Sequence, residues 1–487
     1  MDFTELYRFH GNLAFSPNSR FILAAIQNRL VLRTTSTFQI FQTWQIDQSP
    51  TPTNALFSSK DKTSSEPISH IGWSCDSEYL LAASTKQGTV HVYNVQDINW
   101  SARIESGTEG LVKAEWAPDG RTILCFSQWG LRVTIWSLVT GVASATYIQF
   151  PVHPDTGYAF RSDGRYFILA ERHKSKDTLG VYDTQDSYKL VRHFPLPTSA
   201  LASLALSPTG NHFAVWEGPI EYKLHVLSLA GDLQGSFSPD SDPGFGIRRV
   251  SWHPSGMFLA VGGWDDKIHI LDLTWTVAAT LELSARIPSG VVSVPFGENH
   301  PNGRRQQKVE VSYHVPNYSA TKPASESIAD ERLRSPHSIV IQRADMTKSN
   351  PKSGTAQLEW NKNGSLLLVR FDNSPNALHI FDFPTMEQPE FRPRLRSVLL
   401  HSRPIAHARW NPVRKGSLIL CCASQSLYMW SDEWVGENGE EEMAECIGVP
   451  AKSFETRDIR WTPDGKGVVL LDSKDSLFCC AFEVEDA

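Results

Sequence analysis

The residues of this chain with the clearest potential for chemistry are aromatic rings that occur near charged side chains. Each ring lies at or just beyond the end of a short apolar run. The aromatic members are Trp129, Trp216, Trp264 and Phe371, and the charged members are Arg172, Lys176, Glu217, Asp265 and Asp266. Aromatic rings surrounded by charge are typical of the centres of protein interfaces. We therefore predict a partner-binding set here, with packing of the rings over neighbouring repeats as the alternative interpretation.

Patterns that carry catalysis, cofactors or metals are missing from the sequence. It has no Gly-x-Ser-x-Gly elbow, no phosphate-binding Gly-x-x-x-x-Gly-Lys loop and no His-Glu-x-x-His motif. His91, His269 and His379 recur at one place in similar strand patterns, and we interpret this as an outward strand position repeated by symmetry. We expect a non-enzymatic protein with no catalytic, cofactor-binding or metal-ligating residues.

Composition limits the partners and the compartment. A net charge of −7 over 487 residues gives no basic field, which makes broad nucleic-acid binding unfavourable. Seven cysteines without a Cys-x-x-Cys pair favour a reducing compartment. The first residues lack the pattern of a secretory signal, and no apolar run reaches the roughly 20 residues of a membrane span. We expect a soluble cytoplasmic protein with no membrane contact.

A repeat positions these residues. Nine times a hydrophobic anchor precedes a turn-forming tetrapeptide and a short apolar run. The anchors are Phe15, Trp73, Trp116, Phe160, Leu206, Trp252, Trp360, Trp410 and Trp461. Successive anchors lie 43 to 58 residues apart, except for 108 between Trp252 and Trp360. A period in the forties is typical of WD-repeat β-propellers, whose blades are four-stranded sheets around a channel.

The tetrapeptides indicate tight hairpins. In Ala117-Pro118-Asp119-Gly120, proline presets φ, aspartate caps the turn and glycine accepts positive φ. Only the turn after Trp410 looks looser, with Gly416 late. Apolar runs and then alternating runs follow the turns, which predicts an all-β fold.

The two ends of the chain suggest how the ring closes. The final repeat has no room for its outer strand, and residues 3–9 precede the first anchor as outer strands precede the others. Pairing residues 3–9 with the last blade would remove two exposed sheet edges. We therefore predict one domain over residues 1–487, a closed ring of about nine blades. Two smaller propellers are the alternative.

Three segments interrupt the repeat. We interpret residues 285–355 as a flexible insertion between blades, and residues 48–66 and 435–450 as surface loops. The insertion has strand-like pieces at 309–313 and 338–341, and a tolerated insertion without a role is the simplest explanation of it. A degenerate tenth blade is a further possibility.

Several motifs resemble one family in particular. They are Met1-Asp2-Phe3-Thr4-Glu5-Leu6-Tyr7, Arg29-Leu30-Val31-Leu32-Arg33, Thr134-Ile135-Trp136-Ser137-Leu138, Leu169-Ala170-Glu171-Arg172, Ala214-Val215-Trp216 with Glu221-Tyr222-Lys223, and Pro375-Asn376-Ala377. Together they are similar to the centrosomal WD-repeat protein eight family, also described as the WD-repeat protein antisense to the p-seventy-three gene. The similarity extends over nearly every repeat, and residues 48–66 and 300–350 depart from it.

The resemblance implies a scaffold at the spindle pole body or centrosome, part of the microtubule organising centre of the cytoskeleton. Its expected partner is a coiled-coil anchoring protein of the SSX-interacting or Msd type. That partner would connect it to a kinesin-fourteen motor and, indirectly, to γ-tubulin complexes, so that microtubule minus ends are anchored during mitotic spindle organisation. A translation-initiation-type propeller that binds the ribosome or RNA is the alternative.

Overall fold

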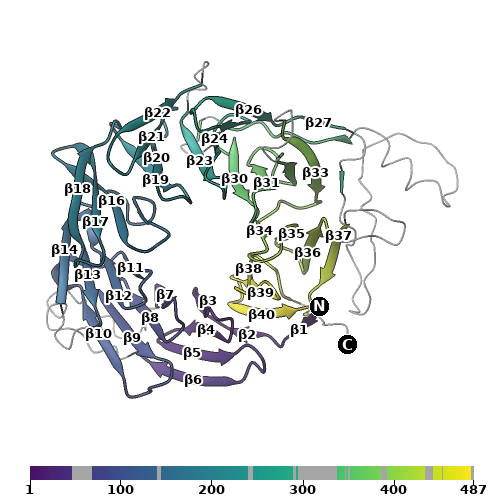
Figure 1. Ribbon diagram of the computed structural model, residues 1–487. Helices are drawn as coiled ribbons and strands as arrows, with labels where there is room; N and C mark the ends of the chain where they lie inside the picture. Colours follow the sequence, from purple (N-terminus) through teal and green to yellow (C-terminus); the bar gives the residue numbers. More distant parts are fainter. Residues whose placement is uncertain are drawn as a thin grey trace.

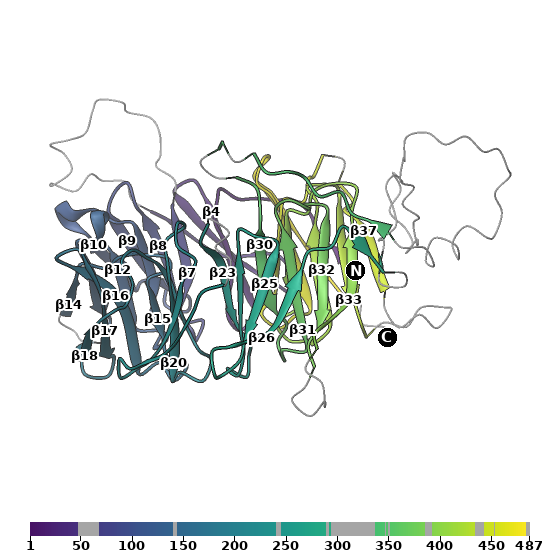
Figure 2. The same ribbon diagram turned by 90° about the horizontal axis from the view of Figure 1, so that it is seen from above.

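The computed structural model describes residues 1–46, 68–139, 144–239, 245–288, 292–293, 337–345, 347–348, 351–384, 392–433, 443–451 and 453–483. These residues form a ring of sheets around a central channel (Figure 1), and the ring seen from its edge is a thick disc (Figure 2). The all-β propeller prediction is therefore confirmed. Among the described residues, no helix has the length and apolar character needed to cross a bilayer.

Each described blade is an antiparallel sheet ordered from the channel to the rim, and there are nine such sheets. The innermost strands are β3 (Leu13–Phe15), β7 (His70–Trp73), β11 (Lys113–Trp116), β15 (Tyr158–Phe160), β19 (Leu201–Leu206), β23 (Ile247–Trp252), β30 (Thr355–Trp360), β34 (His407–Trp410) and β38 (Asp458–Trp461). The second strands are β4 (Phe21–Ile26), β8 (Tyr79–Ser84), β12 (Thr122–Phe126), β16 (Tyr166–His173), β20 (His212–Glu217), β24 (Leu259–Gly263), β31 (Leu366–Phe371), β35 (Ser417–Cys421) and β39 (Gly467–Asp472).

The third and outer strands complete the blades. The third strands are β5 (Arg29–Thr34), β9 (Thr89–Asn94), β13 (Arg132–Ser137), β17 (Lys176–Asp183), β21 (Leu224–Ser228), β25 (Lys267–Leu271), β32 (Ala377–Asp382), β36 (Ser426–Ser431) and β40 (Leu477–Phe482). Eight outer strands are β6 (Ile40–Gln45), β10 (Ser101–Glu105), β14 (Ser144–Gln149), β18 (Lys189–Pro195), β22 (Leu233–Phe237), β26 (Val277–Glu282), β33 (Arg394–Leu400) and β37 (Met443–Gly448). The single nine-bladed ring is confirmed over the pair of smaller propellers.

All nine anchors are the last residues of the innermost strands. The fourth residue of the following tetrapeptide has positive φ in eight turns, for example +66° at Gly120 and +70° at Gly465. The exception is the turn after Trp410, as its sequence predicts, because Arg414 stands where the others have a residue with positive φ. Glycine adopts this conformation without steric cost, which explains why the tetrapeptide so often ends in glycine.

The apolar core lies between neighbouring blades. One cluster joins Leu23 and Leu32 of the first blade to Leu80 of the second, and another joins Leu368 of the seventh to Trp430 of the eighth. Each blade therefore depends on both of its neighbours, as expected of a repeat that cannot bury its hydrophobic faces alone.

The N-terminal segment closes the ring. Strands β1 (Asp2–Phe3) and β2 (Tyr7–Arg8) both pair antiparallel with β40. Between them the Thr4 hydroxyl accepts a hydrogen bond from the Cys480 amide at 3.0 Å, so the predicted strand over residues 3–9 consists of two short pieces. The buried Phe9 ring packs 6.1 Å from the Phe478 ring. The N-terminus accordingly lies beside β40 in Figure 1.

The predicted insertion and loops fall largely outside the described residues. This applies to residues 48–66, to 309–313 and to most of 285–355. The described parts of the insertion are β27 (Arg286–Ile287), which pairs with β29 (His337–Ser338), and β28 (Val292–Ser293), which lies parallel to β33. The loop prediction for 435–450 is wrong in its second half, since residues 443–448 form the outer strand β37.

The repeated histidines are buried, which corrects the outward position expected for them. His91, His269 and His379 lie in β9, β25 and β32, and each is less than one-tenth exposed. Burial lowers the pKa of His379 to about 4 and that of His401, which packs against the Tyr428 ring, to about 3. The strand alternation misled the assignment because neighbouring blades cover both faces of a middle strand.

Ring closure can be tested by replacing Phe9 with alanine. Loss of this buried ring is expected to reduce the free energy of unfolding by about 3 to 5 kcal/mol. The control is Leu6→Ala in the same segment, since Leu6 is 39% exposed. Chemical denaturation of both variants measures the difference. Equal stabilities would show that the N-terminal segment does not seal the ring.

Acid should destabilise the ring through its buried histidines. Unfolded imidazoles take up a proton near pH 6.5, whereas folded His379 and His401 do so near pH 4 and pH 3. The unfolded state binds more protons within this window, so stability falls as the pH falls. The two residues contribute a slope of about 2 kcal/mol per pH unit near pH 5. Denaturation curves between pH 7 and pH 5 should show that His401→Phe lowers this slope by about half.

Candidate protein-binding surfaces

The predicted binding residues lie at or beside the connections between second and third strands. Because strand direction alternates within each blade, these connections share one face of the ring, here called the upper face. Three of the predicted residues are not exposed there. Trp216 and Phe371 pack in the cores between blades. The carboxylate of Glu217 is buried and accepts hydrogen bonds from the amides of Ser199 and Ala200 at 2.9 and 3.0 Å. Their assignment as partner contacts is therefore wrong.

Arg172 and Lys176 lie on the hairpin between β16 and β17. The Arg172 guanidinium is part of an internal ion pair, with Nε 2.8 Å from Oδ1 of the buried Asp177. Asp177 also accepts a hydrogen bond from the Leu201 amide at 2.8 Å. Arg172 thus supports a buried carboxylate, although its side chain remains 43% accessible, and Lys176 is exposed as well.

Trp264, Asp265 and Asp266 are held against the next blade. The Arg248 guanidinium stacks 4.4 Å from the Trp264 ring, and Asn373 donates a hydrogen bond to Asp266 at 2.7 Å. Burial raises the pKa of Asp265 to about 6. These half-buried residues stabilise the junction between the sixth and seventh blades and leave little aromatic surface for a partner.

Among the predicted partner-binding residues, Trp129 is the most exposed. Its side chain is 91% accessible, and Leu131 and Phe150 beside it are each 43% accessible. The Phe150 amide donates a hydrogen bond to the Leu131 carbonyl at 3.0 Å, and the centre of the Phe150 ring lies 5.4 Å from that of the His173 ring. We call Trp129, Leu131 and Phe150 the Trp129 patch. It connects the third blade to the basic hairpin of the fourth.

The loop that carries Trp129 is held in a fixed shape. Trp129 lies in the 3-10 turn η2 (Gln128–Gly130) and has φ of +61°, a left-handed conformation that is uncommon for a tryptophan. The Ser127 hydroxyl accepts a hydrogen bond from the Arg132 amide at 2.8 Å and closes the loop. Beside it, Glu109 of the 3-10 turn η1 (Gly107–Glu109) forms an ion pair with Arg132. Strain of this kind persists where surrounding contacts enforce it, and it is often found at functional sites.

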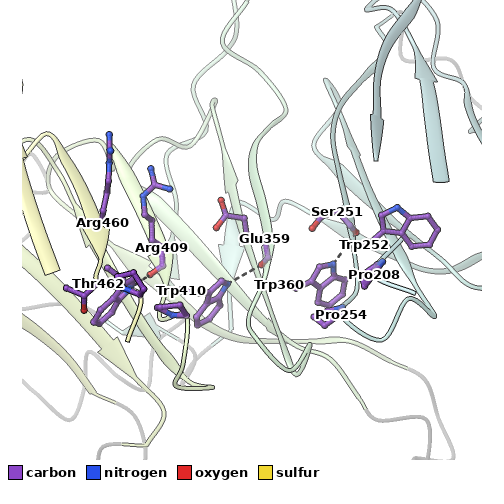
Figure 3. A pocket seen from close by; sticks show the side chains of 13 residues that line it. Pro208, Ser251, Trp252, Pro254, Glu359, Trp360, Arg409, Trp410, Arg460 and Thr462 are labelled. Atoms are coloured by element: carbon purple, nitrogen blue, oxygen red, sulfur yellow. Dashed lines mark hydrogen bonds between the residues drawn. The ribbon is translucent and has the colours of Figure 1, made fainter. Parts of the chain in front are cut away.

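A second surface, which sequence reasoning missed, lies along the channel wall (Figure 3). Trp252, Trp360, Trp410 and Trp461 stand side by side in a concave site of about 770 Å³. We call these four tryptophans the indole row. The adjoining turns supply a rim of prolines, and Glu359, Arg409 and Arg460 place charged side chains along the row. The repeat of tryptophan anchors in the sequence could have predicted this site, since equivalent residues of successive blades are neighbours in a closed ring. Trp252, Trp410 and Trp461 are each only 9% accessible, so a partner at this site would meet mainly the rim and the charged side chains rather than the indole faces.

The indoles of this row also connect the blades. Each N–H donates to the carbonyl of the residue just before the preceding anchor. The pairs are Trp252 with Ala205 at 3.0 Å, Trp360 with Ser251 at 3.2 Å, Trp410 with Glu359 at 3.2 Å and Trp461 with Arg409 at 3.1 Å. Between the last and the first blade, the Arg460 guanidinium donates to the Leu13 carbonyl at 2.8 Å.

These repeats and surfaces define the chain as a WD-repeat β-propeller with surfaces suited to protein partners. Residues 231–272 match the family model described as WD domain, G-beta repeat. The chain is 30% identical to the WD repeat-containing protein WRAP73 of Mus musculus, with 100% of this chain and 97% of that protein covered. It belongs to the WRAP73 family, in agreement with the resemblance noted in its motifs.

Two further comparisons are more distant. An uncharacterised WD repeat-containing protein of Schizosaccharomyces pombe is 20% identical, with 82% of this chain and 77% of that protein covered. A solved structure described as the eukaryotic initiation factor has a TM-score of 0.54 at 11% identity, with 91% of each chain covered. The latter likeness concerns the fold alone.

The indole row makes a testable contribution to stability. In Trp410→Phe the Glu359 carbonyl loses its donor, and the free energy of unfolding should fall by about 1 to 3 kcal/mol. The exposed Trp129 provides the control, since Trp129→Phe removes no such hydrogen bond. Urea denaturation compares the two variants, and an equal loss in both would contradict the role given to the indole N–H.

Proposed function

We propose that this protein is a non-enzymatic scaffold at the spindle pole body or centrosome. In this proposal it binds a coiled-coil anchoring protein and thereby helps to hold microtubule minus ends and a minus-end-directed kinesin-fourteen motor. Membership of the WRAP73 family and the WD-repeat ring support the scaffold class. The cellular place and the partners come from the motif resemblance, and the binding surface is proposed from the geometry of the ring.

The observation that carries the proposal is the rigid presentation of Trp129. Tryptophan is prominent among residues that dominate binding energy in interfaces. Here the ring is 91% exposed on a loop fixed by hydrogen bonds and an ion pair. A partner that covers it would bury a large apolar area with little loss of loop entropy, because the loop is already ordered.

The neighbouring charges favour a helical partner with an acidic edge. Lys174 and Lys176 are exposed on the hairpin that follows Arg172, and the Arg172 amide donates to the Phe150 carbonyl at 2.9 Å. The basic hairpin therefore adjoins the apolar patch. A helix from a coiled-coil protein could place an apolar stripe over Trp129, Leu131 and Phe150, with acidic residues toward the lysines.

Two faces of the ring allow two partners at once. The Trp129 patch lies on the upper face, whereas the prolines beside the indole row belong to turns on the opposite face. A coiled-coil protein on one face would leave the other for a second protein, and the linked binding events would strengthen recruitment to the pole. Contact with γ-tubulin complexes would then be indirect.

The binding surface can be tested with Trp129→Ala. Loss of a central aromatic contact is expected to weaken binding of the coiled-coil partner by about 30-fold or more. The melting temperature should stay unchanged, because the side chain is exposed. Ile220→Ala is the matched control, since Ile220 is 82% exposed and lies beyond β20 in the corresponding connection of another blade. Titration of purified proteins measures both affinities, and equal affinities would remove the Trp129 patch from the proposal.

The cellular part of the proposal has its own test. A fluorescently tagged chain should concentrate at the spindle poles of dividing cells, and the signal should fall with Trp129→Ala but not with Ile220→Ala. Co-sedimentation of the wild-type chain with ribosomes, without signal at the poles, would instead favour the translation-initiation alternative.

A further inference from the structure

Glu171, His173 and His193 converge on the outer part of the fourth blade. Glu171 and His173 are two positions apart on β16, so their side chains lie on the same face of the sheet. His193 reaches that face from β18. The His173 Nε2 atom lies 2.8 Å from Glu171 Oε2, and the His193 Nε2 atom lies 3.3 Å from the same oxygen. Two imidazole nitrogens thus face one carboxylate oxygen.

The intervening strand makes room for this cluster. Gly180 of β17 pairs with His193 on one side and Leu169 on the other. A Cβ atom at Gly180 would lie only 2.4 Å from Glu171 Oε1, so any larger residue would displace the carboxylate. The other oxygen, Oε1, accepts a hydrogen bond from the Tyr182 hydroxyl. Tyr182 therefore orients the carboxylate so that Oε2 is directed to the histidines.

The surroundings of the Glu171 carboxylate suggest that a cation belongs here. The Glu171 side chain is almost fully buried, and among the described residues its recorded ion pairs are with His173 and His193 alone. Imidazole nitrogens are the commonest metal ligands in proteins, and a metal ion shared with them would offset the charge of the carboxylate. Buried charges in proteins are usually paired or coordinate metals.

We propose that Glu171, His173 and His193 form a binding site for a divalent transition metal of the zinc type. Two imidazole nitrogens and one carboxylate oxygen are ligands that Zn²⁺ accepts. All three ligand atoms lie within 4.8 Å of one another. Tetrahedral zinc holds its ligand atoms about 3.3 Å apart, so a modest adjustment of the two histidine side chains would admit the ion. The sequence did not reveal the cluster, because the whole of β17 separates His193 from the other two ligands along the chain.

The site opens toward solvent. It lies in a pocket of about 510 Å³ between the third and fourth blades, lined also by Tyr147, Tyr188 and Leu190. The histidine side chains are 39% and 37% accessible, so an ion can enter without unfolding of the blade. Three protein ligands leave a fourth position for water. The ion would tie β18 to β16 beside the Trp129 patch, which His173 adjoins through Phe150.

The test uses the untagged full-length protein after treatment with a chelator. Titration with ZnCl₂ should give one saturable site and a higher melting temperature. His193→Ala and His173→Ala should each weaken zinc affinity at least about 10-fold. Tyr182→Phe should weaken it by about 10- to 100-fold, the usual effect of losing a group that orients a ligand.

His225→Ala is the control for a general effect of histidine loss. His225 lies on β21 in the next blade and contacts the Ser236 hydroxyl at 2.7 Å. This variant should bind zinc like the wild type. Absence of saturable binding by the wild-type protein, or equal binding by the variants of His193, His173 and His225, would overturn the proposal. Visible absorption of the Co²⁺-loaded protein gives a second readout, because histidine coordination changes the spectrum of the ion.

Discussion

The structure depends on contacts between blades rather than within them. A four-stranded sheet of this size has two apolar faces, and only a neighbour on each side can bury them. The indole row also fixes how neighbouring blades are oriented, because each indole N–H donates a hydrogen bond to a carbonyl of the preceding inner strand. Since every blade needs two neighbours, an open arc would expose apolar surface at both ends. The ring therefore closes through Arg460, β1 and β2, because the first and last blades must also bury their apolar faces.

A closed ring of this kind favours binding over chemistry. The strands are covered on both faces, so polar groups such as Glu217 and Asp177 are used to satisfy loop amides. What remains for partners is the set of connections on each face and the channel wall. The Trp129 patch lies among the connections of the upper face and the indole row along the channel wall, whereas the Glu171 cluster lies on the outer part of the fourth blade, next to the Trp129 patch. Hydrogen bonds and ion pairs hold the Trp129 loop, and hydrogen bonds hold the indole row, within the ring itself.

Sequence reasoning was most accurate where a feature is local. The anchors, the tetrapeptide turns and the looser turn after Trp410 all follow from residue types within a few positions, and the structure places them as expected. It failed for Trp216 and Phe371, because residues near the end of a second strand can be covered by the next blade. It failed in the same way for His379, where strand alternation suggested an outward side chain although both faces of the strand are covered.

The sequence by itself indicated about nine blades, their order and the family, because these depend on a repeated local pattern and on identity along the chain. The structure decided that the blades form one ring of nine. It also contained the N-terminal segment that closes the ring. Only the tertiary structure decided which aromatic rings face solvent, which of them line one concave wall, and which polar groups meet across strands. Glu171 and His193 lie 22 residues apart in the chain. They come together because Gly180 on the strand between them leaves an opening, and such a contact depends on side-chain positions in three dimensions.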